Sequence, residues 1–80
     1  MKVIFKYGPL TPSFDCSVQG RIVSVGIQNS EIYVWAEQGE DLQSFKVKFV
    51  ATGQGYDGDY VGTVFEANGL LVWHVIRETQ

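Results

Sequence analysis

Short runs of alternating apolar and polar residues, each ended by turn-forming residues, constrain this chain more than any other feature. Successive side chains of a β-strand point to opposite faces, so this period of two is typical of strands with one buried face. The pattern predicts seven strands, at Lys2–Tyr7, Ser13–Gln19, Arg21–Gln28, Glu31–Glu37, Gln43–Ala51, Tyr60–Glu66 and Leu70–Arg77. We therefore expect one all-β domain over residues 1–80. It would be a small antiparallel sheet of six or seven strands, as a meander, a partly closed barrel or a sandwich, with little or no helix.

The turns between these runs predict three hairpins and their register. Asn68-Gly69 is the strongest two-residue hairpin signal, because both residues tolerate positive φ. It is expected to pair Phe65 with Val72, Thr63 with His74, Val61 with Ile76, Val64 with Trp73, Gly62 with Val75 and Ala67 with Leu70. A turn at Asn29-Ser30 is expected to pair Ile27 with Ile32, Val25 with Val34 and Val23 with Ala36. A loop through Gly39 is expected to pair Ala36 with Phe45, Val34 with Val47 and Ile32 with Phe49.

These pairings give the middle of the predicted sheet two unlike faces. The aliphatic face forms the expected core and consists of Val23, Val25, Ile27, Ile32, Val34, Phe45, Val47 and Phe49. The opposite face carries Ser24, Gly26, Tyr33, Trp35, Lys46 and Lys48. Tyr33, Trp35, Lys46 and Lys48 together could stack a planar ligand and neutralise a phosphate. Alternatively, the two aromatic rings pack as a second core layer, or they form a protein interface, where Tyr and Trp are enriched.

A glycine-rich acidic segment separates the fifth and sixth predicted strands. Its glycines allow close approach of the backbone to a partner, and Tyr56 and Tyr60 flank Asp57 and Asp59. It lacks the Gly-Lys-Ser/Thr of a P-loop and most ligands of a calcium loop. We expect either a flexible connection or a surface that contacts a partner. The candidate partner-binding residues are Tyr33, Trp35, Glu40, Asp41, Tyr56, Asp57, Asp59 and Tyr60.

The composition argues against several classes of function. A net charge of −3 with only six basic residues disfavours direct nucleic-acid binding. Cys16 is the only cysteine, and one cysteine with one histidine cannot build a zinc site. We expect Cys16 to be a buried structural thiol and His74 to be packed and bonded across the sheet to Thr63. We expect no metal, cofactor, signal peptide or membrane span.

Several motifs along the chain match those of a known family. They are the opening strand Lys2–Tyr7, the central segments Val25–Asn29 and Val34–Ala36, the element Ala51–Gly53, the strand Tyr60–Val64 and the ending Gly69–Val75. In this order they resemble a family of small proteins of unknown function that bacteriophages and prophages encode. The ending, similar to the family's Gly-Leu-Val-Trp-His-Val motif, is the most specific part. The resemblance implies a phage or mobile-element origin and a location in the host cell cytoplasm, and it implies no catalytic residues.

Small size, acidic charge and the lack of a catalytic set lead to one main functional hypothesis. The chain is expected to be a non-enzymatic protein that binds and inhibits a host protein complex, such as a host-defence (anti-CRISPR) inhibitor. This step follows an analogy with other small phage proteins rather than a motif. One alternative is a small-ligand binder or sponge for a nucleotide signal. Another is a phage structural or assembly protein, and exposed sheet edges would also allow a homodimer.

Overall fold

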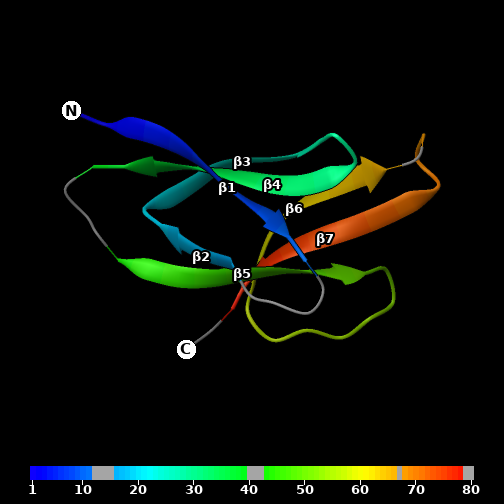
Figure 1. The fold of residues 1–80 in the computed structure, drawn as a ribbon. Helices are drawn as coiled ribbons and strands as arrows, with labels where there is room; N and C mark the ends of the chain where they lie inside the picture. Colours follow the sequence, from blue (N-terminus) through cyan, green and yellow to red (C-terminus); the bar gives the residue numbers. More distant parts are fainter. Residues whose placement is uncertain (12–15, 40–42, 67, 79–80) are drawn as a thin grey trace.

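The computed structural model describes residues 1–11, 16–39, 43–66 and 68–78 of the chain. Within this part the chain folds as seven β-strands without a helix, and every strand pairing is antiparallel (Figure 1). The strands are β1 (Val3–Leu10), β2 (Cys16–Gln19), β3 (Arg21–Gln28), β4 (Glu31–Gln38), β5 (Ser44–Ala51), β6 (Asp59–Glu66) and β7 (Leu71–Arg77). The predicted all-β class and number of strands are confirmed.

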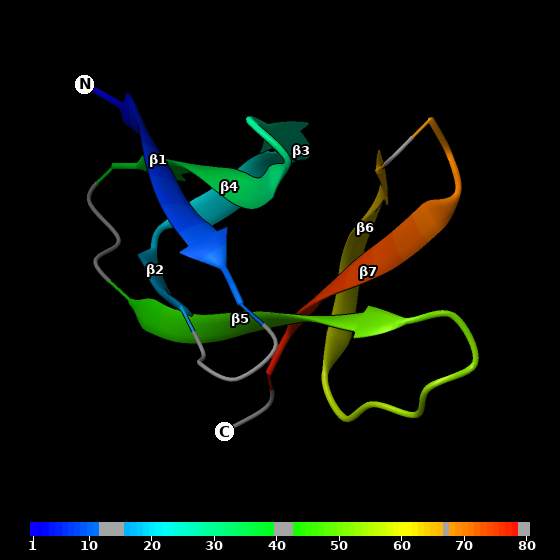
Figure 2. The same ribbon diagram turned by 45° about the vertical axis from the view of Figure 1, so that its right-hand side comes forward.

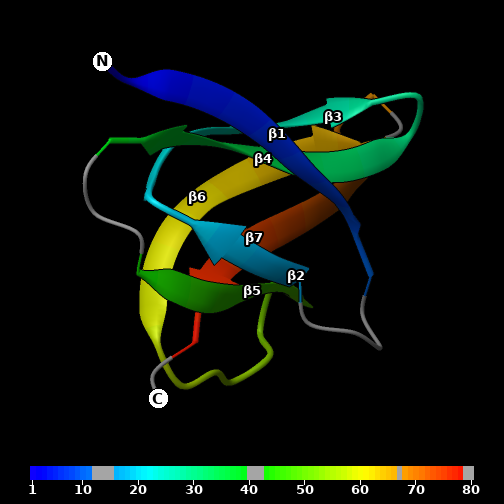
Figure 3. The ribbon, with the colours of Figure 1, turned by 60° about the vertical axis from the view of Figure 1, so that its left-hand side comes forward.

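The strands form two sheets that are not closed into a barrel. The first sheet has the order β1-β4-β3 and the second has the order β2-β5-β7-β6. The first sheet lies above the second, and the tip of the β6–β7 hairpin rises beside β3 (Figures 2 and 3). The two sheets meet at this edge, where the Val25 side chain of β3 packs on Gly62 of β6.

Gly20 is the one residue between β2 and β3, so it connects the second sheet to the first. Its φ of 94° lies in the region that favours glycine, and a Cβ at this position would collide with the Glu37 carbonyl. Its amide donates a hydrogen bond to the Gln43 carbonyl at 3.2 Å. The Gln38 amide nitrogen adds a second tie between the sheets, donating to Tyr7 Oη of β1 at 2.7 Å and to Gln19 Oε1 of β2 at 3.1 Å.

Two of the predicted hairpins form around the turns that predicted them. Asn29 and Ser30 have φ values of 52° and 62°, and Asn68 and Gly69 have 57° and 87°, as a turn of the primed type requires. The confirmed pairs in these hairpins are Ile27 with Ile32, Val25 with Val34, Phe65 with Val72, Thr63 with His74, Val64 with Trp73 and Gly62 with Val75. The predicted partner of Leu70, Ala67, lies outside the described residues.

Two predicted pairs are wrong because each hairpin contains a bulge. Ala36 pairs with Ile22 rather than Val23, and Ile76 pairs with Tyr60 rather than Val61. The extra residue shifts the register by one beyond the bulge and bends the strand. Val23 consequently leaves the predicted core and is 40% exposed.

The predicted β4–β5 hairpin is also wrong, because the two strands belong to different sheets. β4 has β1 and β3 as its neighbours, so Phe5 rather than Phe45 lies opposite Ala36. β5 lies between β2 and β7, which places Val75 opposite Phe49. The alternation in these strands identified which side chains are buried, but it does not specify which strand lies alongside.

The core fills the space between the sheets with small aliphatic side chains. The buried residues of this core are Leu10, Val18, Ile32, Val34, Ala36, Phe45, Val47, Val64 and Val75. Val50 and Ile76 are also buried but lie outside this cluster. Val25, Ile27 and Phe49, which the sequence placed in the core, are partly buried and pack against it. Val50 and Ile76 alternate to the outer face of the second sheet, so another segment must cover them there.

Gly62→Ala is expected to lower the free energy of unfolding by about 1–3 kcal/mol, the usual cost of overpacking. A Cβ at Gly62 would lie 2.8 Å from Val25 Cγ2, and the β-branched valine has little freedom to move away. Urea unfolding followed by circular dichroism measures the change. The matched control is Gly55→Ala, because a Cβ at Gly55 meets no atom within 4 Å. Equal stability of the two variants would contradict the contact between β3 and β6.

Candidate binding surfaces

Tyr33 and Trp35 lie side by side on the outer face of the first sheet. Their ring centroids are 6.4 Å apart and the rings are tilted by 53°. Each ring covers a glycine of a neighbouring strand: a Cβ at Gly26 would lie 3.4 Å from Trp35 Cζ3, and one at Gly8 would lie 2.9 Å from Tyr33 Cδ1. Both side chains are half-buried. The aromatic pair therefore packs on the sheet and leaves part of each ring open to solvent.

The lysine beside this pair is Lys6, which sequence reasoning did not identify. Its Nζ lies 4.7 Å from the centroid of the Tyr33 ring and donates a hydrogen bond to Gln28 Oε1 at 3.1 Å. Lys6 on β1 and Gln28 on β3 thus meet across β4, above Tyr33. Lys46 and Lys48 lie on β5 of the other sheet, and Lys48 pairs with Glu78 at 3.4 Å. The structure does not bring Tyr33, Trp35, Lys46 and Lys48 together.

The glycine-rich segment is anchored at both ends to the second sheet. The Ala51 amide donates to Gln54 Oε1 at 3.0 Å, and the Gln54 amide donates to the Ala51 carbonyl at 3.1 Å. At the other end Gly58 has a φ of 131°, and a Cβ there would collide with the Arg77 carbonyl and lie 3.1 Å from Ile76 Cγ2. The segment therefore covers Ile76 on the outer face of the second sheet.

Four candidate residues of this region are exposed. Tyr56 and Tyr60 are 47% and 56% exposed, and Asp57 and Asp59 are exposed as well. The structure thus brings Tyr56, Asp57, Asp59 and Tyr60 together in one exposed segment, on the opposite side of the molecule from the β3–β4 turn (Figure 1). Two further candidates, Glu40 and Asp41, lie outside the described residues.

His74 forms a chain of polar contacts beside this segment. Its Nδ1 lies 3.0 Å from Thr63 Oγ1, as the sequence predicted, and its Nε2 lies 2.8 Å from Thr52 Oγ1. Thr63 Oγ1 also lies 2.5 Å from the Tyr60 hydroxyl. The ring joins β7 to β6 and to the residue after β5. Both ring nitrogens therefore have a hydrogen-bond partner, which fixes the orientation of His74 under the loop.

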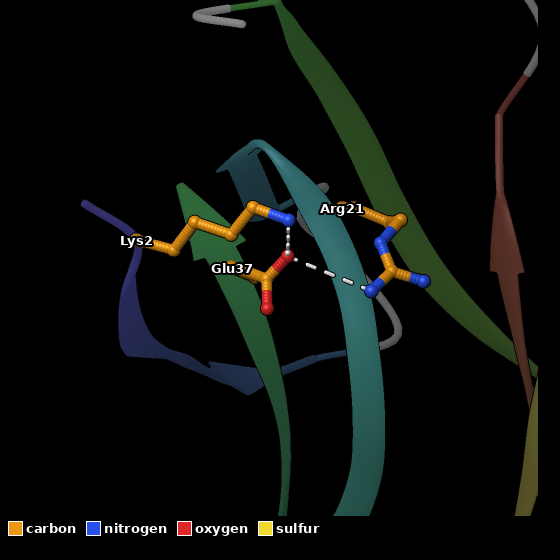
Figure 4. Close-up of polar contacts among 3 residues, drawn as sticks. All are labelled: Lys2, Arg21 and Glu37. Carbon is orange, nitrogen blue, oxygen red and sulfur yellow. Dashed lines mark ion pairs between the residues drawn. The ribbon is translucent and has the colours of Figure 1, made fainter. Parts of the chain in front are cut away.

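A cleft of about 660 Å³ opens between the sheets at the end where β3, β5 and β6 begin. On the wall formed by the first sheet, Glu37 Oε1 lies 3.5 Å from both Lys2 Nζ and Arg21 Nη2, with the carboxylate between the two cations (Figure 4). On the wall formed by the second sheet, Arg77 Cζ lies 4.1 Å from the centroid of the Phe45 ring. Because the contacts of Lys2 and Arg21 are long and exposed, each contributes at most about 1 kcal/mol.

Sequence reasoning missed this cluster because its members are far apart along the chain. The available signal was a cross-strand charge pair in the β3–β4 hairpin, where Arg21 lies opposite Glu37. The predicted register lacks the bulge at Val23, so its continuation beyond Val23 and Ala36 does not set Arg21 opposite Glu37. A register corrected by one residue would have found the pair.

Comparison with known proteins places the chain in a family. A family model described as a domain of unknown function (DUF7352) matches residues 1–80. The chain belongs to this family. No curated protein and no solved structure matches the chain. Membership in the DUF7352 family assigns no activity.

The described residues contain no group of three or more His, Cys, Asp or Glu side chains that could hold a metal ion. In the same part of the chain, no helix has the length and apolar character needed to cross a membrane.

Cys16 is expected to react slowly with a thiol reagent in the folded protein. Cys16 is half-buried and points to the inner side of β2, where it packs against the core. Burial raises the pKa of this thiol, which lowers the fraction of reactive thiolate at a given pH. At pH 8 we expect a lower rate than that of the same protein unfolded in urea. Equal rates in the two states would contradict the burial of this side chain.

Proposed function

We propose that this protein is a non-enzymatic phage or mobile-element protein that binds and inhibits a host protein complex, of the kind exemplified by host-defence (anti-CRISPR) inhibitors. One observation supports this proposal above the others: two tyrosines and two aspartates are exposed in one anchored segment. In this proposal Tyr56, Asp57, Asp59 and Tyr60 form the principal contact surface, and the protein acts in the host cytoplasm.

The composition of this segment suits a protein interface with a basic partner. Tyrosines supply large contact areas at interfaces and rank among the residues that dominate binding energy. The exposed carboxylates of Asp57 and Asp59, in a chain with a net charge of −3, complement a basic surface and increase the rate of encounter. Host complexes that bind nucleic acid present such surfaces.

The anchoring of the segment supports tight binding. The hydrogen bonds of Gln54 to Ala51 and the close approach of Gly58 to β7 limit the conformations of the loop. A loop that is ordered before binding loses less entropy when the complex forms. Tyr33 and Trp35 are half-buried, and Lys6 lies over the Tyr33 ring, so this pair exposes less area and is assigned a secondary contact role.

A structural or assembly role is the second candidate function, and one observation favours it. β1 is an edge strand of the first sheet, and it exposes three consecutive apolar residues, Val3, Ile4 and Phe5, at 43%, 57% and 46%. An exposed apolar edge strand is a template for pairing with another strand, including that of a second copy. Light scattering tests this candidate, because a monomer at high concentration argues against it.

The double variant Tyr56→Ala, Asp57→Lys is expected to weaken binding to the host complex by about thirtyfold or more, which corresponds to the loss of one interface hot spot. The complex is first captured from host lysate on the immobilised protein and identified by mass spectrometry. Its affinity for the wild-type protein and for the variant is then measured with purified components, together with inhibition of its activity.

The matched control is Glu31→Lys, which makes the same charge change as Asp57→Lys at an exposed position beside the β3–β4 turn. We expect this variant to bind and inhibit nearly as the wild-type protein does. Equal losses in both variants would show a non-specific charge effect and contradict the assigned surface. A captured complex whose activity the protein leaves unchanged would contradict inhibition.

A further inference from the structure

The cleft between the two sheets combines cationic and apolar walls. Among the described residues, its lining carries three cations, Lys2, Arg21 and Arg77, and two carboxylates, Glu37 and Asp59. Half of the six basic residues of an acidic chain thus surround one opening. The volume of about 660 Å³ lies within the range of sites that bind small molecules.

Arg77 is the central group of this cleft. Its guanidinium stacks on the ring of Phe45, which is only 4% exposed and is therefore fixed by the core. Stacking uses the face of the guanidinium and leaves the N–H groups at its edge available as donors. Asp59 lies opposite Arg77 in the β6–β7 pairing, yet no carboxylate of the described residues lies within 4.0 Å of its nitrogens. Within the described ranges, Arg77 is therefore a positioned cation without an anionic partner.

Arg21 faces the cleft from the other sheet with most of its donors unused. In the described part of the chain its one ion pair is the 3.5 Å contact between Nη2 and Glu37, which Glu37 shares with Lys2. The side chains of Arg21 and Lys2 are 74% and 71% exposed, so both can turn toward a bound anion. In Figure 4 the Arg21 guanidinium lies on the side of Glu37 that is remote from Lys2.

We propose that this cleft binds a small phosphate monoester that carries a flat ring, such as a nucleoside monophosphate. Guanidinium groups bind phosphate oxygens through paired N–H donors, and two guanidiniums with one lysine match a dianion better than a single carboxylate. The ring lies against the apolar part of the lining, formed by Ile22 and Val61. The cleft shares Asp59 and Tyr60 with the proposed protein interface but contains neither Tyr56 nor Asp57. Its test uses a nucleotide and no host protein, so its failure is distinguishable from failure of the proposed interface.

The test is a titration of the folded, full-length protein with adenosine monophosphate, followed by two-dimensional NMR of the backbone amides. Saturable shifts are expected at Gly20, Arg21, Val61 and Arg77, which line the cleft. Inorganic phosphate tests the anion alone and adenosine tests the ring alone, and each is expected to bind more weakly than the monophosphate. Absence of saturable shifts with the monophosphate, or equal binding of adenosine, would overturn the proposal.

Substitution tests the role of the two guanidiniums. Arg77→Gln is expected to weaken binding of the monophosphate about tenfold or more, because a hydrogen-bonded charge is lost. The matched control is Lys48→Gln, which removes the same charge from the second sheet at a position outside the cleft and is expected to change the Kd less than about twofold.

Arg21→Gln, on the exposed wall of the other sheet, is also expected to weaken binding, and it provides the test if Arg77→Gln fails to fold. Equal affinity of Arg21→Gln and Lys48→Gln would overturn the proposal.

Discussion

The fold depends on burying the inner faces of two small sheets against each other. Five side chains at this interface, Val18, Val34, Ala36, Val47 and Val75, are completely buried, and they come from both sheets. A chain of 80 residues with a single cysteine has no disulfide within it, so the stability of the folded state rests on this aliphatic layer. Loss of one of these side chains would leave a cavity that neither sheet could fill by itself, since each is only three or four strands wide.

The limits of this core determine where the two proposed binding sites lie. At the end where β5 begins, Phe45 is the last buried side chain, and the sheets separate beyond it to form the cationic cleft. On the outer face of the second sheet, Val50 and Ile76 need a cover, which the segment with Tyr56 and Asp57 provides. Both sites therefore consist of exposed polar side chains that are positioned by buried apolar neighbours. This support gives a small β domain two preorganised surfaces.

The sequence predicted local features of the fold, such as hairpins, better than it predicted the pairing of strands that are distant along the chain. The turns at Asn29-Ser30 and Asn68-Gly69 determine hairpins by themselves, so most pairs in these hairpins were predicted correctly. The bulges at Val23 and Val61 escaped prediction, because one extra apolar residue leaves the alternation readable in either register. The separation of β4 from β5 depends on β1 and β7, which are distant in sequence. For the same reason, the exposed tyrosine segment was predicted from its composition, whereas the cluster of Lys2, Arg21, Glu37 and Arg77 was not.

β4 and β5, although consecutive in sequence, face each other across the core from different sheets. Backbone nuclear Overhauser effects (NOEs) in the labelled protein measure strand neighbours directly. We expect cross-strand backbone NOEs between Lys6 and Trp35 and between Phe49 and Val75, and none between the backbones of Val34 and Val47. Backbone NOEs between Val34 and Val47 would show that β4 and β5 pair in one continuous sheet, and would contradict both the core and the cleft described above.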